Sequence, residues 1–269
     1  IELGGPAIMN DALLSGSVDF IAAGPPAFIT LWDRTRGNSD VRGVAAIAAL
    51  PMYLNTHAEH LHSLEDLRAT DRIAVTAIKV SIPALVMQMY AAEQHGTDEA
   101  ERYDRYTVTM THPDGVVAML SRSTEINAHF TSPPFHHREI AEEDIRTIMT
   151  TDDVLGDATT FTMLSTTADF HDSRPALYAA VLAALEEAQT MITEDPNTAA
   201  EVLVRAGEGG GFTAEEIADV LSDPDITFSP TPKNTKRYAD FMLETDAISN
   251  AAESWENLFF EELHDVDGS

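Results

Sequence analysis

Apolar residues along the chain form short runs that are separated by polar residues, glycine and proline. The clearest example begins at residues 20–23, an apolar run that is followed by Gly24 and two prolines. A short apolar run bounded by such residues predicts a buried strand. Pro25 and Pro26 favour the first turn of a helix, because the backbone N–H that proline lacks has no partner there. We therefore expect a turn at Gly24 that presents free N–H groups at the carboxyl end of a strand.

The same pattern continues through most of the chain. Further strands are expected at 2–5, 43–50, 52–54, 71–76, 106–110, 125–130, 147–151 and 160–166. Helices are expected at 6–15, 27–35, 63–67, 82–94, 113–120, 174–194, 196–206, 213–221 and 235–245. Strands that alternate with helices indicate βαβ units, which place strands parallel in one sheet. The acidic tail from Glu253 onward is expected to be frayed or solvated.

These elements predict an α/β protein with two lobes. Each lobe is expected to be a mainly parallel sheet flanked by helices, with the helical C-terminal segment on the first lobe. Residues 1–67 and 158–269 form the expected first lobe, and residues 68–157 form the second. Two crossovers between the lobes would act as a hinge beside a cleft.

Composition narrows the range of partners. The 269 residues carry 45 Asp and Glu against 16 Lys and Arg, which gives a net charge of -29. Such a charge argues against binding to nucleic acid or to an anionic membrane. The chain has no cysteine, so disulfides, cysteine metal sites and thiol catalysis are excluded. No run approaches the roughly 18 apolar residues of a membrane span.

Candidate catalytic and metal-binding motifs are weak. His57, His60 and His62 are close in the sequence, as are His136 and His137. Helical spacing does not place the first three on one face, and a zinc site needs three or four ligands. We therefore interpret all of them as solvated histidines. The sequence contains no nucleophile elbow, Walker loop or dinucleotide fingerprint, and we expect no catalytic residue, no cofactor and no metal site.

Four stretches, taken in order, resemble a known family. They are Glu2-Leu3-Gly4-Gly5-Pro6 with Ala12-Leu13 and Gly16-Ser17-Val18-Asp19-Phe20; Ala23-Gly24-Pro25-Pro26-Ala27; Leu64-Glu65-Asp66-Leu67 with Arg72-Ile73-Ala74-Val75 and Lys79-Val80-Ser81; and Phe170 with Arg174-Pro175-Ala176-Leu177. Their order and spacing are similar to those of the periplasmic substrate-binding proteins of ABC importers with the type II fold. Within that group the resemblance is to nitrate, sulfonate and taurine binders, which are related to binders of thiamine-pyrimidine precursors. The first strand–helix unit of the family is expected to be missing from this chain.

The resemblance implies a solute-binding component of an ABC importer and not an enzyme. The protein would capture a small anionic or polar organic molecule, of the sulfonate, taurine or nitrate kind, when its two lobes close. Expected partners are this ligand and an inner-membrane permease, and the protein is expected to be monomeric. Its expected location is the periplasm after export, either free or lipid-anchored. Alternative functions are a thiamine-pyrimidine binder, a ligand-sensing lobe, a metal receptor and a pyrimidine-precursor synthase, although the last resembles enzymes with a Cys-rich segment.

The expected ligand site consists of loops at strand ends. Its residues are Gly24, Pro25, Pro26, Lys79, Val80, Ser81, Phe130, Thr131, Ser132, Phe135, Thr162 and Met163. Lys79 would supply a positive charge for an anion. Ser81 would cap a helix whose first N–H groups also face the ligand. Phe130, Phe135 and Met163 would line the apolar part of the site.

Each part of this site also has a purely structural interpretation. Lys79 would pair with a carboxylate on the surface, and Ser81 would only cap its helix. Residues 131–135 would form a plain turn with a core phenylalanine. The turn at Gly24 would hold no ligand. Residues 162–163 lie near an expected crossover, where they would form either a hinge or the floor of the cleft.

Overall fold

The structure is a computed structural model of the 269-residue chain, and it describes the backbone of residues 6–269 and side chains from residue 9 onward. The strand expected at 2–5 lies outside the described residues. The chain divides into two compact units: Ile1–Leu50 with Thr159–Ser269, and Pro51–Ala158. The expectation of an α/β fold with sheets flanked by helices is confirmed.

The sheet of the first unit has three strands in the order β1-β8-β2. They are β1 (Ile21–Ala23), β2 (Arg42–Ala49) and β8 (Thr160–Thr166). β8 is antiparallel to both neighbours, so the expectation of a mainly parallel sheet is wrong for the described strands of this unit. The reason is the path of the chain: β1 and β2 run in the same direction, but the chain returns from the second unit and inserts β8 between them.

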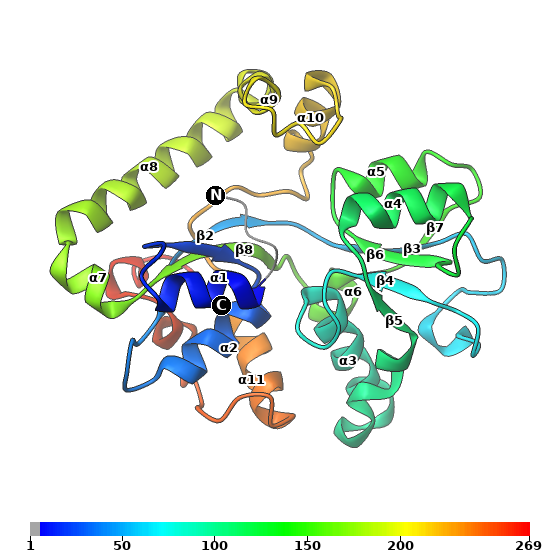
Figure 1. Ribbon diagram of the computed structural model, residues 1–269, viewed down its shortest axis with the longest axis horizontal. Coiled ribbons are helices and arrows are strands. Elements are labelled where there is room, and N and C mark those ends of the chain that lie inside the picture. The colour runs from blue at the N-terminus through cyan, green and yellow to red at the C-terminus, as the bar shows by residue number, and fades with distance from the viewer. Residues whose placement is uncertain (1–5) are drawn as a thin grey trace. The chain divides into compact units, whose positions relative to one another are not determined.

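Seven α-helices belong to the described part of the first unit. They are α1 (Pro6–Leu14), α2 (Pro25–Thr35), α7 (Ala168–Ser173), α8 (Pro175–Glu194), α9 (Pro196–Arg205), α10 (Ala214–Leu221) and α11 (Thr235–Glu244). Figure 1 shows α2 and α11 on one side of the sheet and α8 on the other. Phe28 and Trp32 of α2 are almost fully buried, which explains why this helix is anchored to the core.

The C-terminal tail is packed and not frayed, which corrects the expectation. It forms two short 3-10 helices, Trp255–Leu258 and Glu261–Leu263. Phe259 is fully buried, and the N–H of Phe260 donates to the carbonyl of Gly43 at 3.0 Å. Acidic residues of the tail alternate with these apolar ones. The acidic charge suggested a solvated tail, but burial of the aromatic side chains holds the tail against the core.

The second unit has a five-stranded sheet in the order β5-β4-β6-β3-β7. Its strands are β3 (Tyr53–Thr56), β4 (Ile73–Val75), β5 (Thr107–Thr109), β6 (Ala128–Thr131) and β7 (Arg146–Thr150). Its helices are α3 (Ile82–His95), α4 (His112–Ser121), α5 (Phe135–Ile140) and α6 (Thr151–Leu155), with 3-10 helices at Leu64–Asp66 and Thr97–Tyr106. β4 is parallel to β5 and β6, while β3 is antiparallel to β6 and β7. The sheet is therefore mixed and not mainly parallel.

The division between the units differs from the expected lobe boundary. The expectation assigned residues 51–67 to the first lobe, whereas β3 lies between β6 and β7 in the second unit. The hydrogen-bonded register pairs Tyr53 with both Thr131 and Thr150. Both strands flanking β3 come much later in the chain, so the local sequence around β3 does not reveal its sheet.

No helix among residues 6–269 combines the length and the apolar character that crossing a membrane requires.

Candidate functional site

Three loops of the second unit meet at one edge of its sheet. The parallel strands β4, β5 and β6 are adjacent, and each is followed by a helix: α3, α4 and α5 respectively. The carboxyl ends of these strands therefore lie together with the amino ends of the helices. This edge is where open α/β sheets bind ligands, and residues 76–81, 110–111 and 132–134 form it.

Ser81 caps α3 at this edge. Its hydroxyl accepts a hydrogen bond from the N–H of Ala84 at 3.4 Å and donates to the carbonyl of Ala77 at 2.6 Å. Pro83 occupies the second helical position and has no N–H to satisfy. Within the described chain, the N–H of Ile82 finds no acceptor. The start of α3 thus presents one free donor at the positive end of the helix dipole.

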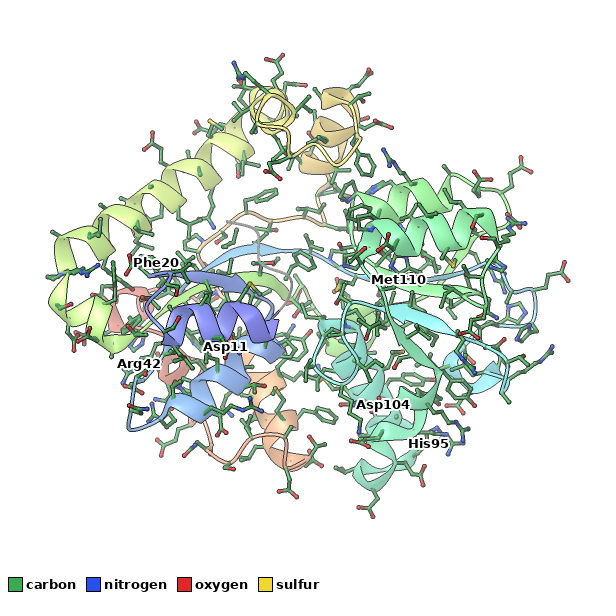
Figure 2. The ribbon with its side chains drawn as sticks, in the orientation of Figure 1. Asp11, Phe20, Arg42, His95, Asp104 and Met110 are labelled. Carbon is green, nitrogen blue, oxygen red and sulfur yellow. The ribbon has the colours of Figure 1, made fainter. Side chains whose placement is uncertain are left out.

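The start of α4 repeats this arrangement. Thr111 caps the helix, its hydroxyl accepting from the N–H of Asp114 at 3.3 Å and donating to the Asp114 carboxylate at 2.7 Å. Pro113 again follows as the second helical residue, and the N–H of His112 finds no acceptor among the described residues. Met110, which Figure 2 labels, lies directly before this cap. The sequence interpretation did not include this loop, although a hydroxyl residue two positions before proline occurs at both starts.

The loop after β6 brings together three predicted site residues. Thr131 is fully buried, and its hydroxyl lies 3.1 Å from His112 Nδ1. Ser132 is also buried, and its carbonyl accepts from the N–H of His136. The ring of Phe135 is half-buried and stacks on the ring of His112 with a centroid distance of 5.7 Å. Phe130 is fully buried in the core, which agrees with its structural interpretation.

Lys79 lies on the loop before α3, but its ammonium group pairs with carboxylates of the 3-10 helix Thr97–Tyr106. Nζ lies 2.6 Å from Glu101 Oε1 and 3.8 Å from Asp104 Oδ2. The hydrogen bond with Glu101 raises the pKa of Lys79. Asp104, which Figure 2 labels, also accepts hydrogen bonds from Gln88, and burial raises the pKa of Asp104. Val80 beside Lys79 is 46% exposed.

The remaining predicted residues lie in the first unit. Gly24 precedes α2, and Pro25 and Pro26 form its buried first positions. The register pairs Ala23 of β1 with Met163 of β8, so residues 162–163 lie beside the turn at Gly24. Met163 is fully buried, and its side chain therefore supports the turn from inside the core.

A buried polar network extends behind the second-unit edge, and the sequence interpretation missed it. Asn55, His129 and Glu139 are fully buried. Asn55 Nδ2 donates to Glu139 Oε2 at 2.8 Å, while Glu139 Oε1 lies 2.6 Å from His129 Nδ1. His129 Nε2 lies 3.4 Å from His112 Nδ1. The available signal was weak: Asn55 directly follows the apolar Leu54 in β3, and His129 lies between the apolar Ala128 and Phe130 in β6.

The histidines expected to be solvated lie in different surroundings. His136 is buried and its ring stacks on Tyr53 with a centroid distance of 3.7 Å, so the expectation is wrong for this residue. The first sequence cluster does not assemble: His60 Nε2 lies 3.0 Å from Asp71, and His57 Nε2 lies 3.4 Å from the carbonyl of Ile126. The described residues contain no group of three or more His, Asp or Glu side chains arranged to hold a metal ion.

Comparisons with solved structures support the fold. The alkanesulfonate-binding protein SsuA of Xanthomonas axonopodis pv. citri, solved with MOPS bound, is 12% identical, and the match covers 93% of this chain and 83% of that one with a TM-score of 0.68. The periplasmic aliphatic sulphonate binding protein SsuA of Escherichia coli is 16% identical, with 97% and 80% covered and a TM-score of 0.63. The ligand-binding component of an ABC-type import system from Staphylococcus aureus, solved with zinc bound, is 13% identical, with 98% and 86% covered and a TM-score of 0.67.

Sequence comparison assigns the family. Curated proteins include no match to this chain. A sequence model of the NMT1-like family matches residues 5–206, which is most of the chain. The solved relatives are similar to the chain at low identity and share its fold of helices around two sheets. The chain therefore belongs to the NMT1-like family and has the fold of the periplasmic binding proteins.

Proposed function

We propose that this protein is the solute-binding component of an ABC importer, and that it captures a small organic anion of the sulfonate class. The observation that carries the proposal is the pair of helix starts at the edge of the second-unit sheet. Ile82 and His112 each present a backbone N–H at the positive end of a helix dipole. Such donors suit the oxygens of an anion, and two solved relatives with this fold are named as sulfonate binders.

The proposed site keeps the residues expected from the sequence and adds the loop before α4. Ser81 would hold the start of α3, while Thr131, Ser132 and Phe135 would support the apolar and polar walls. Lys79 would bind the anion only after leaving Glu101, because the two side chains form an ion pair in the structure. Gly24, Pro25, Pro26, Thr162, Met163, Val80 and Phe130 complete the proposed set. Closure of the two units around the ligand, like delivery to a permease, belongs to the proposal.

The negative charge of the protein is compatible with an anionic ligand. Its net charge is -29, but exposed charges farther away than a Debye length, about 8 Å at physiological salt, are largely screened. Hydrogen-bond donors at contact distance act inside that range. Local donors therefore decide whether the anion binds, and the distant carboxylates mainly slow its approach.

A thermal-unfolding screen tests the proposal. The purified protein is heated with MOPS, taurine, nitrate, acetate, a thiamine pyrimidine and zinc, each in a separate sample. A ligand present at a hundred times its dissociation constant stabilises the protein by about 2.7 kcal/mol, which raises the melting temperature by several degrees. We expect MOPS or taurine to give this shift. A shift with the pyrimidine or zinc alone would replace the sulfonate class with the corresponding alternative.

Calorimetric titration then locates the site. The Ser81→Ala variant weakens the start of α3, and we expect lower affinity for the sulfonate that produced the thermal shift. Ser63→Ala provides a matched control, because Ser63 caps the 3-10 helix Leu64–Asp66 in the same unit. Equal affinity in both variants and in the wild-type protein would place the ligand away from α3.

A further inference from the structure

His112 is the outer member of a chain of hydrogen-bonding groups that extends into the core of the second unit. Its Nδ1 faces inward, 3.1 Å from the Thr131 hydroxyl and 3.4 Å from His129 Nε2. His129 Nδ1 in turn lies 2.6 Å from Glu139 Oε1. Four elements contribute to this hydrogen-bonded network: β3 supplies Asn55, α4 supplies His112, β6 supplies His129 and α5 supplies Glu139.

The orientation of Asn55 identifies the acceptors in this network. The Thr147 hydroxyl donates to Asn55 Oδ1 at 2.7 Å, and the amide nitrogen of Asn55 faces Glu139. Glu139 Oε2 accepts that N–H, and Oε1 accepts from His129. A buried carboxylate with hydrogen bonds on both oxygens is stabilised in its ionised form when a positive partner offsets its charge. His129, whose Nδ1 lies 2.6 Å from Glu139 Oε1 in a fully buried pair, is placed to be that partner.

Protonation of His129 determines which nitrogen of His112 carries a proton. A protonated His129 has a hydrogen on both ring nitrogens, so its Nε2 donates to His112 Nδ1. The Thr131 hydroxyl is a second donor in reach of the same atom. His112 Nδ1 therefore acts as an acceptor, and the single proton of the neutral ring lies on Nε2. Burial and the positive charge of His129 lower the pKa of His112 to about 3, so the ring is neutral at physiological pH.

The position of His112 connects this series of hydrogen-bonding groups to the proposed ligand edge of the second-unit sheet. His112 is the first residue of α4, directly after the cap Thr111. Its Nε2 has no partner among the described residues and is not enclosed by protein atoms. Phe135 stacks on one face of the ring and holds its plane. The ring thus has one hydrogen-bonding atom committed to the interior and one left for a ligand.

We propose that His112 is a ligand-binding residue whose Nε2–H donates to an anionic oxygen, and that Glu139 and His129 are positioning residues that hold this tautomer. The proposal rests on the proposed capture of a sulfonate. It adds a neutral side-chain donor to the backbone N–H groups at the same edge. It also explains why a carboxylate, an amide and a second imidazole are buried together behind that edge.

The charged and titratable groups on the elements around His112 leave its Nε2 available to donate to a ligand. Asp114 on α4 is held by Thr111. Glu139 on α5 is balanced by His129 on β6. His136 Nδ1 on α5 lies 3.2 Å from Asn55 Nδ2 on β3 and acts as an acceptor there. None of these contacts engages His112 Nε2.

Nitrogen NMR of the histidine rings tests the tautomer without any ligand. The His112 signals are assigned by their absence from the His112→Gln spectrum. We expect a neutral ring with its proton on Nε2 throughout pH 5 to 8. In Glu139→Gln the carboxylate that faces His129 is replaced by an amide, so the buried pair with His129 is lost and the His112 proton should move to Nδ1. A proton on Nδ1 in the wild-type protein, or titration of His112 within this range, would overturn the proposed tautomer.

Calorimetric titration with MOPS and taurine tests the binding role. His112→Leu removes the donor, and we expect roughly ten- to hundredfold weaker binding, the effect of losing a hydrogen bond to a charged group. His112→Gln retains an N–H donor at a similar distance and should recover most of the affinity. His62→Leu is the matched control, because this exposed histidine lies in the same unit outside the network.

The outcomes separate the two proposals. If the wild-type protein binds a sulfonate and His112→Leu binds it equally well, the ligand role of His112 is wrong and the proposed function stands. If the wild-type protein binds neither probe, the sulfonate function is overturned together with the ligand role. The NMR spectrum still judges the tautomer in that case, since it requires only the folded protein.

Discussion

The ring of His129 occupies the space where a side chain at Gly115 would lie. A Cβ atom on Gly115 would overlap His129 Cε1 and lie 2.5 Å from Nε2. α4 therefore packs directly on the imidazole through a residue without a side chain. This contact brings the first residue of α4, His112, into reach of His129.

Gly115→Ala should destabilise the protein, because the added methyl group must displace either α4 or the His129 ring. Overpacking of this kind costs about 1–3 kcal/mol. Urea unfolding of the variant measures the change. Val117→Ala is the matched control in the same helix, since Val117 is 66% exposed and its truncation should matter little. An unchanged midpoint for Gly115→Ala would mean that α4 and β6 pack less tightly than the structure shows.

Phe259→Ala should show that the acidic C-terminal tail is part of the core. Phe259 is fully buried and its ring packs beside Phe28 at a centroid distance of 5.9 Å. Removing such a ring costs about 3–5 kcal/mol. Leu177→Ala, at a residue 49% exposed, should cost far less. Similar unfolding midpoints for the two variants would contradict the packed tail and would support the solvated tail that the sequence indicated.

Acid should destabilise the protein through His112. The unfolded chain protonates this histidine near pH 6.5, whereas burial and the positive His129 hold its native pKa at about 3. Between these values the unfolded state binds more protons, so stability falls as the pH is lowered. The slope reaches about 1.4 kcal/mol per pH unit for one such group.

Unfolding of the wild-type protein and of His112→Gln at pH 7, 6 and 5 isolates this contribution. The variant has no titrating group at this position, so its stability should decline less on acidification. Parallel declines in the two proteins would show that His112 is protonated in the native state as readily as in the unfolded one.

Lys79→Met separates the two interpretations of this lysine. Lys79 and Glu101 are both exposed and form a surface ion pair, and such pairs contribute about 0–1 kcal/mol. The unfolding free energy should therefore change little. Sulfonate affinity, measured by calorimetry, should fall if Lys79 leaves Glu101 to bind the anion. Unchanged affinity would leave the ion pair as its role, and Lys236→Met, which removes a comparable pair with Asp240, controls for the loss of one positive charge.

Local sequence determined the elements of the fold and several of their boundaries. The apolar run before Gly24 is a strand, and the prolines after it begin a helix, as predicted. Ser81 caps α3, which ends at His95, directly before Gly96. These features depend on residues within a few positions of each other, such as a side chain that accepts from an N–H three residues later. Their physical causes are therefore visible in a short stretch of sequence.

Tertiary structure decided the directions of strands, the partners of side chains and the contents of the site. The insertion of β8 between β1 and β2 depends on hydrogen bonds between residues more than a hundred positions apart. Asn55 likewise reaches Glu139 across 84 positions, and Glu139 contacts His129 from a different element of the fold. Burial makes their mutual hydrogen bonds obligatory, because unpaired polar groups in a core are costly. Sequence periodicity reports which residues are buried, but only the packing of distant elements decides which buried groups face each other.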